Sequence, residues 1–231
     1  MAEETTIELK RAALNHYFQN LNTPQQQAVF HVNGPVLVLA GAGSGKTTAM
    51  IHRIVQMIHF GNGWVQANAS ITKEDAAYLK DYIADKQPAD LERLCSILAV
   101  QPIQPWHILA ITFTNKAANE LRSRLLQAIG EECASMLHAS TFHSACARIL
   151  RRSISKLGYD SNFTIYDTDD SQRLMKSCIA DADVSEKQFP PRAVLTEISL
   201  AKDRMCSPEY FCIEAGSDYR KMVIGKLYKE Y

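Results

Sequence analysis

The stretch LVLAGAGSGKTT, residues 37–48, constrains this chain more than any other feature of its 231 residues. An apolar run breaks into glycines and ends in Gly-Lys-Thr-Thr, which fits a phosphate-binding loop with Ala40 in place of the usual first glycine. Small residues let successive backbone N–H groups curl around a β-phosphate, which then lies on the positive end of the following helix. The stretch therefore predicts a strand, a nucleotide-binding loop and a helix, in that order.

Two side chains of this loop carry the expected chemistry, and both are candidate catalytic residues. Lys46 is expected to reach the β- and γ-phosphates of a bound nucleotide. Thr47 is expected to place its hydroxyl on Mg²⁺, an octahedral ion that takes oxygen ligands and keeps several waters. The alternative is a glycine-rich turn of purely structural use, which the strand before the loop and the helix after it disfavour.

Strand-like and helix-like patterns alternate along the first two thirds of the chain. A continuous apolar, β-branched run is typical of a buried strand in a parallel sheet, and a one-sided apolar stripe is typical of a helix packed on it. This alternation predicts an α/β fold with a parallel sheet. The expected strands are residues 34–40, 107–113 and 135–141, and the expected helices are residues 5–20, a helix capped by Thr23 with Pro24 at its first position, and residues 46–60, 115–129 and 142–157.

Two regions interrupt the alternation. About 45 residues, 61–105, stand where a link of roughly 2 to 6 is usual, and Thr72 with Asp75 predicts a capping box inside them. Their stretch 72–93 carries six acidic and four basic residues, which argues against a DNA-binding patch and leaves a helical decoration of unassigned role. From about Tyr166 onward the patterns predict only helices, residues 167–182 and 191–204 among them, and the end of the chain lacks a helix stop signal, so we expect a fragment.

Composition narrows the partners and the compartment. The 25 basic residues balance 25 acidic ones, so a nucleic-acid site must be local. The six cysteines include no C-x-x-C pair and have no histidines at metal-ligand spacing, which favours reduced, packed thiols. The amino-terminal segment lacks the features of a signal peptide and no apolar run approaches a membrane span of about 20 residues. These features predict a cytoplasmic protein without a membrane partner.

A first candidate DNA contact lies where the second expected strand ends. Thr112, Phe113, Thr114 and Asn115 stand at the strand-to-helix junction, the edge at which doubly wound sheets bind ligands. An exposed aromatic there can stack on a base, worth about 1 to 3 kcal/mol, while hydroxyls and helix N–H groups hold phosphates. The alternative is that Phe113 closes the core, as most aromatic residues do.

A second candidate follows the third expected strand. Thr141, Phe142 and His143 repeat the arrangement, although no partner makes His143 a catalytic base. Arg148 and Arg152 begin a basic stripe that continues through Lys156, with Arg151 beside it, and no acidic residue occurs between Cys133 and Tyr159. We expect this stripe to face a phosphate backbone, with a solvated surface as the alternative. The opposite face is expected to pack on a core through Phe142, Cys146, Ile149 and Leu157.

Four stretches of the sequence, taken in order, resemble the amino-terminal part of UvrD/Rep/PcrA-type superfamily I DNA helicases. They are LNTPQQQAV, VLAGAGSGKTT, ILAITFTNKAANELRSRL, and TFHSACARILRR with FTIYDTDDSQRLMK. The resemblance covers Leu21 to about Arg204, apart from residues 61–105. It implies a partial RecA-like P-loop sheet in residues 1–140 and an incomplete, inserted all-helical subdomain in residues 141–231. It also implies ATP and Mg²⁺ as cofactors and single-stranded and duplex DNA as partners.

The same resemblance assigns the remaining site residues. Gln25 belongs to the motif that reads adenine, Phe113 stacks on a base, and Thr48 stands where many relatives carry an arginine near the nucleotide. The nucleotide-binding candidates are thus Gln25, Gly41, Ala42, Gly43, Ser44, Gly45, Lys46, Thr47 and Thr48. The DNA-binding candidates are Thr112, Phe113, Thr114, Asn115, Thr141, Phe142, His143, Arg148 and Arg152.

The resemblance implies that the whole protein is an ATP-dependent helicase that unwinds DNA 3′ to 5′. No Asp-Glu pair follows an apolar strand after the basic stripe, so the Walker B carboxylates, the second RecA-like domain and the arginine finger are expected outside these residues. The chain alone is therefore expected to be inactive. Two alternatives stay open: a non-catalytic module that binds nucleotide or single-stranded DNA, and the amino-terminal piece of a helicase-nuclease.

Overall fold

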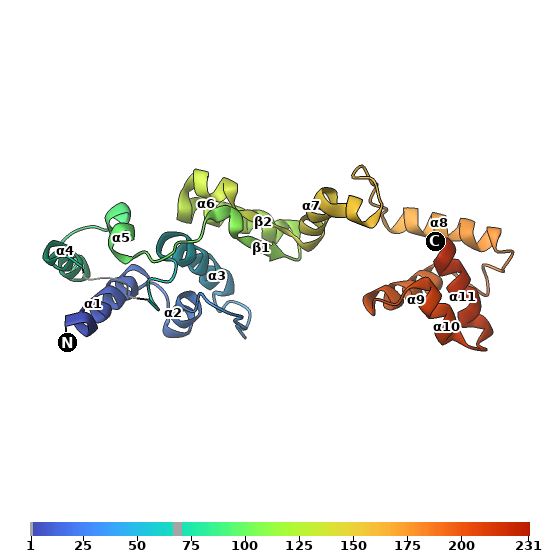
Figure 1. Ribbon diagram of the computed structural model, residues 1–231, viewed down its shortest axis with the longest axis horizontal. Coiled ribbons are helices and arrows are strands. Elements are labelled where there is room, and N and C mark those ends of the chain that lie inside the picture. The colour runs from blue at the N-terminus through green and yellow to red at the C-terminus, as the bar shows by residue number, and fades with distance from the viewer. Residues whose placement is uncertain (1, 67–70) are drawn as a thin grey trace. The chain divides into compact units, whose positions relative to one another are not determined.

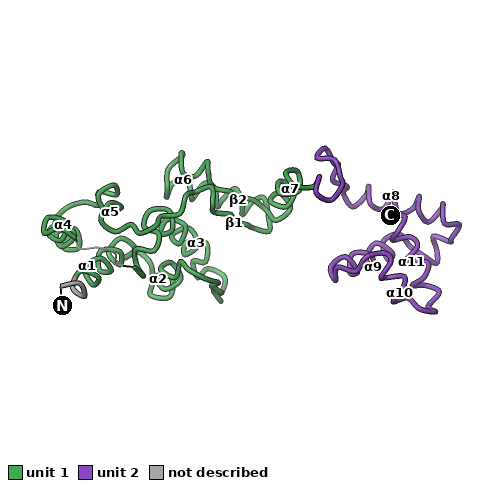
Figure 2. The backbone as a smooth tube through the Cα atoms, in the orientation of Figure 1, with its two compact units in different colours: residues 1–154 green, residues 155–231 purple. Residues whose placement is uncertain are grey.

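The computed structural model describes residues 2–66 and 71–231, and Figure 1 shows its elements. The chain divides into two compact units, residues 1–154 and residues 155–231 (Figure 2). We call them unit 1 and unit 2. The division lies beyond the expected boundary between residues 140 and 141, because the helix that follows the second strand stays with unit 1.

A parallel pair of strands in unit 1 positions the candidate DNA contacts. Strand β1, Leu109–Thr112, pairs with β2, His138–Thr141, in a register that sets Thr112 opposite Thr141. Helix α6, Asn115–Met136, crosses between them and is broken at Gly130, whose φ of 78° is left-handed. The structure is therefore helix-rich with one small parallel sheet, and both strands end at the same edge, as the alternating pattern predicts.

The prediction of a buried strand at residues 34–40 is wrong. No strand is assigned to this run, and Leu37 and Leu39 are 84% and 87% exposed. A strand is stabilised by ladder hydrogen bonds to its neighbours, and no strand within residues 2–66 and 71–231 pairs with this one. The apolar pattern reports which side chains favour burial, but it does not report whether a partner strand is present.

Helices build the core of unit 1. The expected helix 46–60 forms as α3, Lys46–Val55, continued by a π-helical turn over residues 56–60, and α3 packs against α2 and α6. Phe18, Phe60 and Leu121 are among the largest side chains that are fully buried in this core. The remaining elements of unit 1 are α1, Ala2–Tyr17; α2, Thr23–Phe30; α4, Lys73–Ile83; α5, Leu91–Leu98; a 3-10 turn, Pro105–His107; α7, Phe142–Ser153; and a 3-10 turn that begins at Ile154.

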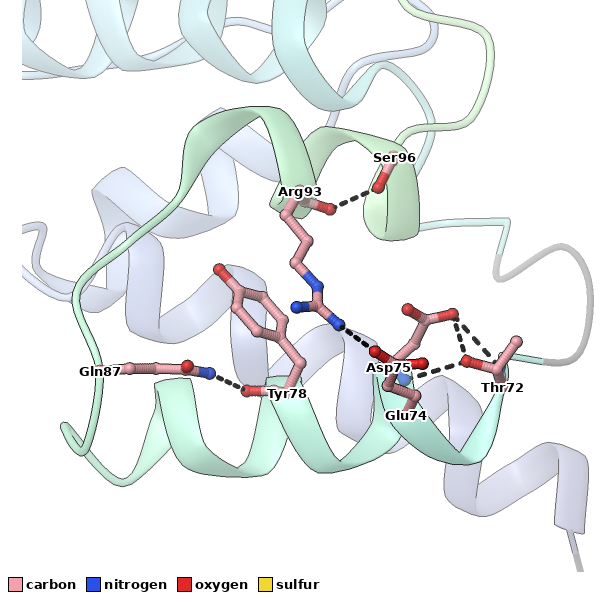
Figure 3. Close-up of polar contacts among 7 residues, drawn as sticks. All are labelled: Thr72, Glu74, Asp75, Tyr78, Gln87, Arg93 and Ser96. Carbon is pink, nitrogen blue, oxygen red and sulfur yellow. Dashed lines mark hydrogen bonds and ion pairs between the residues drawn. The ribbon is translucent and has the colours of Figure 1, made fainter.

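The insertion, residues 61–105, is closed at its base. Gly61 and Val100 form a parallel bridge, and the backbone N–H of Val100 donates to the carbonyl of Phe60 at 3.0 Å. The predicted capping box is confirmed, since Asp75 N donates to Thr72 Oγ1 at 3.0 Å and begins α4 (Figure 3). The two ends of the insertion therefore lie side by side, and helices α4 and α5 lie between them in sequence.

A polar clip joins the two helices of the insertion. The Arg93 guanidinium lies 4.3 Å from the centre of the Tyr78 ring and 3.6 Å from the carboxylate of Glu74 (Figure 3). The Gln87 amide donates to the carbonyl of Tyr78 at 2.9 Å. Helix α4 also packs on α1, and His16 contacts Asp85 there at 3.1 Å. The insertion is thus attached to the amino-terminal helix as well as to the core.

Unit 2 consists of helices, as its sequence predicts. A separate core buries Met175, Ile198, Ile224 and Leu227. None of the helices that the structure describes is long and apolar enough to cross a membrane. The helices of unit 2 are α8, Thr168–Asp181; α9, Pro191–Asp203; α10, Pro208–Ala215; and α11, Tyr219–Glu230.

The buried imidazole of His59 predicts a pH-dependent stability. Its Nε2 is buried without a hydrogen-bond partner in the described residues, and burial lowers the pKa of His59 from 6.5. The unfolded chain therefore binds more protons than the folded one below about pH 6.5, and the free energy of unfolding should fall as the pH drops from 7.5 to 5.5. Denaturant titrations followed by tryptophan fluorescence measure this in unit 1, which holds both Trp64 and Trp106.

The variant His59→Gln should show a weaker pH dependence than the wild type. Some dependence should remain, because burial and the nearby Arg148 and Arg152 also lower the pKa of His138. His31→Gln, at an exposed position, is the matched control and should behave like the wild type. An unchanged slope in His59→Gln would contradict this account.

Candidate nucleotide and nucleic-acid sites

The loop before α3 has the backbone conformation that its glycines permit. Gly43 and Gly45 have φ values of 76° and 81°, a left-handed region that residues with a Cβ rarely adopt. Gly45 is the N-cap of α3, and the Ser44 hydroxyl donates to the carbonyl of Gly41 at 2.8 Å. The loop therefore ends on the N-terminus of a helix, where free N–H groups and the helix dipole favour a phosphate.

Gln25 joins the loop to helix α2. Asn22, and not the expected Thr23, caps α2, and its backbone N–H donates to Gln25 Oε1 at 3.1 Å in a capping box. The Gln25 amide Nε2 then donates to the carbonyl of Ser44 at 3.1 Å. A Cβ on Gly45 would lie 2.5 Å from this Nε2, so Gly45 is needed for the contact as well as for its own backbone angle. The structure thus brings Gln25 and the loop together.

Lys46 lies over the loop. Its Nζ donates to the carbonyls of Ala40 and Gly41, at 3.0 and 2.6 Å, while Thr47 beside it is exposed. A cavity of about 330 Å³ opens here between α2 and the loop, with Gln25 and Lys46 in its wall. Among the residues described, its lining includes no carboxylate. The cavity is therefore suited to an anion, and the Lys46 ammonium can move from its carbonyl partners to contact that anion.

Phe113 is exposed at the carboxyl edge of the sheet. Its side chain is 88% exposed and that of Phe142 45%, and their ring centres lie 5.3 Å apart at an interplanar angle of 41°. The alternative that Phe113 closes the core is therefore wrong. Two aromatic rings, which directly follow the neighbouring strands β1 and β2 in sequence, instead form one exposed pair, an arrangement on which bases can stack.

The threonines beside this pair have a capping role that sequence analysis missed. Thr114 Oγ1 accepts from Ala117 N at 3.2 Å and caps α6, and Thr141 Oγ1 accepts from Ser144 N at 3.3 Å and caps α7. The Thr112 hydroxyl donates to the carbonyl of Thr114 at 3.1 Å. The N-termini of two helices therefore meet the sheet at the aromatic pair, where their N–H groups can hold phosphates.

Helix α7 carries the basic stripe, but its opposite face is not buried. Phe142, Cys146, Ile149 and Leu157 were expected to pack on a core, yet all four are exposed, and Ala145 is the buried residue that the structure records for α7. The expectation failed because a helical stripe shows a preference for burial without showing that another layer covers it. Arg148 and Arg152 lie near enough to His138 to lower its pKa, after the larger effect of burial.

The residues that hold α2 in place were not predicted from the sequence. The ring of Trp64, in the insertion, stacks on Phe30 of α2 with ring centres 3.9 Å apart and an interplanar angle of 4°. Arg11 Nε donates to the carbonyl of Trp64 at 3.2 Å, and Arg53 of α3 donates to the carbonyls of Ala28 and His31. No local pattern predicts these long-range contacts, and they position the helix that carries Gln25.

Comparison with known proteins identifies relatives along most of the chain. Residues 21–72 and 91–231 match the family model described as UvrD/REP helicase N-terminal domain. The ATP-dependent DNA helicase PcrA of Bacillus subtilis is 37% identical over 217 residues, which is 94% of this chain and 24% of that protein. The proteins of the same name from Staphylococcus epidermidis and Staphylococcus aureus are 35% and 34% identical, over 94% and 95% of this chain. The chain spans 24% of the length of each of these relatives.

Proposed function

Because this chain belongs to the UvrD/REP helicase N-terminal domain family, we propose that the whole protein is an ATP-dependent DNA helicase that unwinds duplex DNA 3′ to 5′. Unit 1 supplies the amino-terminal part of a RecA-like ATP-binding domain, and unit 2 supplies part of a helical subdomain inserted in it. The observation that supports the proposal is the hydrogen bond from the Gln25 amide to the carbonyl of Ser44, because it holds the side chain that we propose to read the base beside the glycine-rich loop.

The nucleotide site divides its work among four groups. The loop from Gly41 to Gly45 and the N-terminus of α3 hold the β-phosphate through backbone N–H groups. Lys46 leaves its carbonyl partners for the phosphates, and Thr47 offers its exposed hydroxyl to Mg²⁺. Gln25 orients the base. The donor set fits ATP with Mg²⁺, and the metal supplies charge neutralisation at the phosphates when it is bound.

The DNA site lies along the carboxyl edge of the sheet. Phe113 and Phe142 stack on successive bases of a single strand, while the N-termini of α6 and α7 and the side chains of Arg148 and Arg152 hold its phosphates. ATP binding and hydrolysis between two RecA-like domains would alternately tighten and release this grip in the whole protein. These residues supply one half of each site.

A non-catalytic module that binds nucleotide or single-stranded DNA without turnover is the competing function. It is favoured by the nucleotide cavity, whose described lining includes no carboxylate to position Mg²⁺ or the attacking water. The two functions differ in turnover rather than in binding. An assay of phosphate release on the whole protein separates them.

Single-stranded DNA binding tests the proposed interface. Phe113→Ala should weaken binding of a fluorescent oligothymidylate by about 5- to 150-fold, because base–aromatic stacking contributes about 1 to 3 kcal/mol. Arg152→Ala should make the dependence of log K on log salt shallower by about 0.7, because one phosphate contact is lost. Fluorescence anisotropy at several salt concentrations measures both effects.

Tyr210→Ala is the matched control, since Tyr210 is an exposed aromatic of unit 2 outside this interface. It should bind DNA as the wild type does. Equal affinity of Phe113→Ala and Tyr210→Ala for the oligothymidylate would rule out the stacking role.

A further inference from the structure

A groove lined by both polar and apolar side chains lies within unit 2, and it is distinct from the two sites of unit 1. Its volume is about 510 Å³, and it runs between the first turn of α8 and one face of α9. Neither the nucleotide loop nor the aromatic pair contributes to its lining.

Helix α9 contributes a row of polar side chains. Arg192, Thr196, Ser199 and Lys202 recur every three or four residues, so they share one face of the helix and line the groove. The other face carries Val194, which is buried in the core of unit 2. Packing of the apolar face thus fixes the direction in which the polar row points.

Helix α8 contributes further polar groups from its first turns. Ser171 and Gln172 line the groove, with Tyr166 before the helix 54% exposed at its margin. Asp167 is the one carboxylate in the described lining, and its Oδ1 accepts from Asp170 N at 2.8 Å to cap α8. This hydrogen bond lowers the pKa of Asp167, which keeps the carboxylate ionised and committed to the cap.

The charge of the groove is opposite to that of the unit around it. Residues 155–231 carry eleven basic and thirteen acidic residues, so the unit is acidic overall. Arg192 and Lys202 nevertheless line one groove, and none of the ion pairs that the structure describes involves either of them. Lys202 Nζ lies 5.9 Å from the ring centre of Tyr228. Against the ionised Asp167, the two cations leave the described lining with one net positive charge, which together with the hydroxyls and the exposed aromatic ring fits a phosphorylated ligand.

We propose that this groove binds single-stranded DNA, with Arg192 and Lys202 on its phosphates and Tyr166 stacked on a base. The proposal rests on the proposed function, because DNA is the phosphate source chosen here, and it adds a second contact for the strand in unit 2. An aromatic ring beside a pair of cations is the combination that single-strand binding uses without sequence preference. A free mononucleotide offers the same chemistry, so the experiment must separate the two.

The test uses Arg192→Gln/Lys202→Gln in residues 1–231 or in the whole protein, with oligothymidylate binding measured by anisotropy. Affinity should fall about tenfold, and the slope of log K on log salt should become shallower by about 1.4, since two contacts to a single strand are lost. Lys187→Gln/Arg204→Gln removes the same charge from unit 2 outside the groove and should bind as the wild type does. Binding of the two double variants with equal affinity and slope would overturn the proposal.

Two further arms separate the remaining outcomes. In a Lys46→Ala background, thymidine monophosphate should show no saturable binding by calorimetry. Binding that the groove double variant abolishes would identify a free nucleotide as the ligand and overturn the DNA assignment. If the wild type binds no oligothymidylate, the proposed function fails as well. If Phe113→Ala weakens binding and the groove variant does not, only the groove proposal fails.

Discussion

Lys46→Ala is expected to lower the affinity of residues 1–231 for MgATP by about 10- to 150-fold. A charge-assisted hydrogen bond contributes about 1.5 to 3 kcal/mol, and the Nζ of Lys46 already lies over the loop, 2.6 Å from the carbonyl of Gly41. Removing the ammonium leaves the backbone N–H groups of the loop as phosphate ligands without their cation. Isothermal calorimetry with a non-hydrolysable ATP analogue and Mg²⁺ measures the change.

The matched control for this prediction is Lys80→Ala. Lys80 is an exposed lysine of α4 in the insertion, so its loss removes the same charge without touching the cavity. It should bind nucleotide as the wild type does. Equal affinities of the wild type and Lys46→Ala would mean that the loop is a structural turn.

The second large effect concerns turnover: residues 1–231 alone should hydrolyse ATP only at the background rate. Phosphoryl transfer to water needs a carboxylate near Mg²⁺, a group that positions the attacking water, and positive charge on the transition state. Lys46 and Thr47 provide part of this, and an arginine finger alone is worth about 10³ to 10⁵ in rate. A phosphate-release assay with and without single-stranded DNA, run beside Lys46→Ala and the whole protein, measures the difference.

The acidic cluster at the start of α8 is the obvious substitute for the missing carboxylates. Asp167 accepts a hydrogen bond from the backbone N–H of Asp170, and the Asp170 carboxylate accepts from Asp167 N in return, so both cap the helix. Turnover by residues 1–231 that disappears in Lys46→Ala would show that the catalytic acids had been misplaced.

Local chemistry made much of the fold predictable. The capping box at Thr72 and Asp75, the left-handed glycines of the loop and the helices of unit 2 each depend on residues close together in sequence. A cap or a glycine turn is satisfied by its own neighbours, so its pattern is sufficient evidence for it. The parallel pairing of β1 with β2 followed in the same way from strand, helix and strand in succession.

The errors arose where a pattern needed a distant partner. Residues 34–40 have the composition of a strand but no paired neighbour, and the apolar side of α7 has no covering layer in the described residues. The stacking of Trp64 on Phe30 shows the converse, because this close contact is present although no local sequence pattern predicts it. The sequence pattern indicates which side chains favour burial, whereas tertiary packing determines which element covers them.

The candidate sites divide along the same line. Lys46, Thr47 and the loop glycines could be recognised from spacing alone, and their geometry follows from a strand-like run that leads into a helix. The exposure of Phe113 could not be predicted from the sequence, since an aromatic residue at the end of a strand is more often buried than exposed. The groove between α8 and α9 was not predicted from the sequence, because the polar row on α9 belongs to a helix whose other face packs in the core of unit 2.

If these residues are the ATP- and DNA-binding part of a helicase that moves 3′ to 5′, the whole protein should separate DNA strands in that direction. The measurement uses duplexes that carry either a 3′ or a 5′ single-stranded tail, with and without ATP, for the wild type and Lys46→Ala. The wild type should separate the 3′-tailed duplex when ATP is present, and Lys46→Ala should separate neither. Strand separation that survives in Lys46→Ala, or that requires the 5′ tail, would mean that the proposed function is wrong.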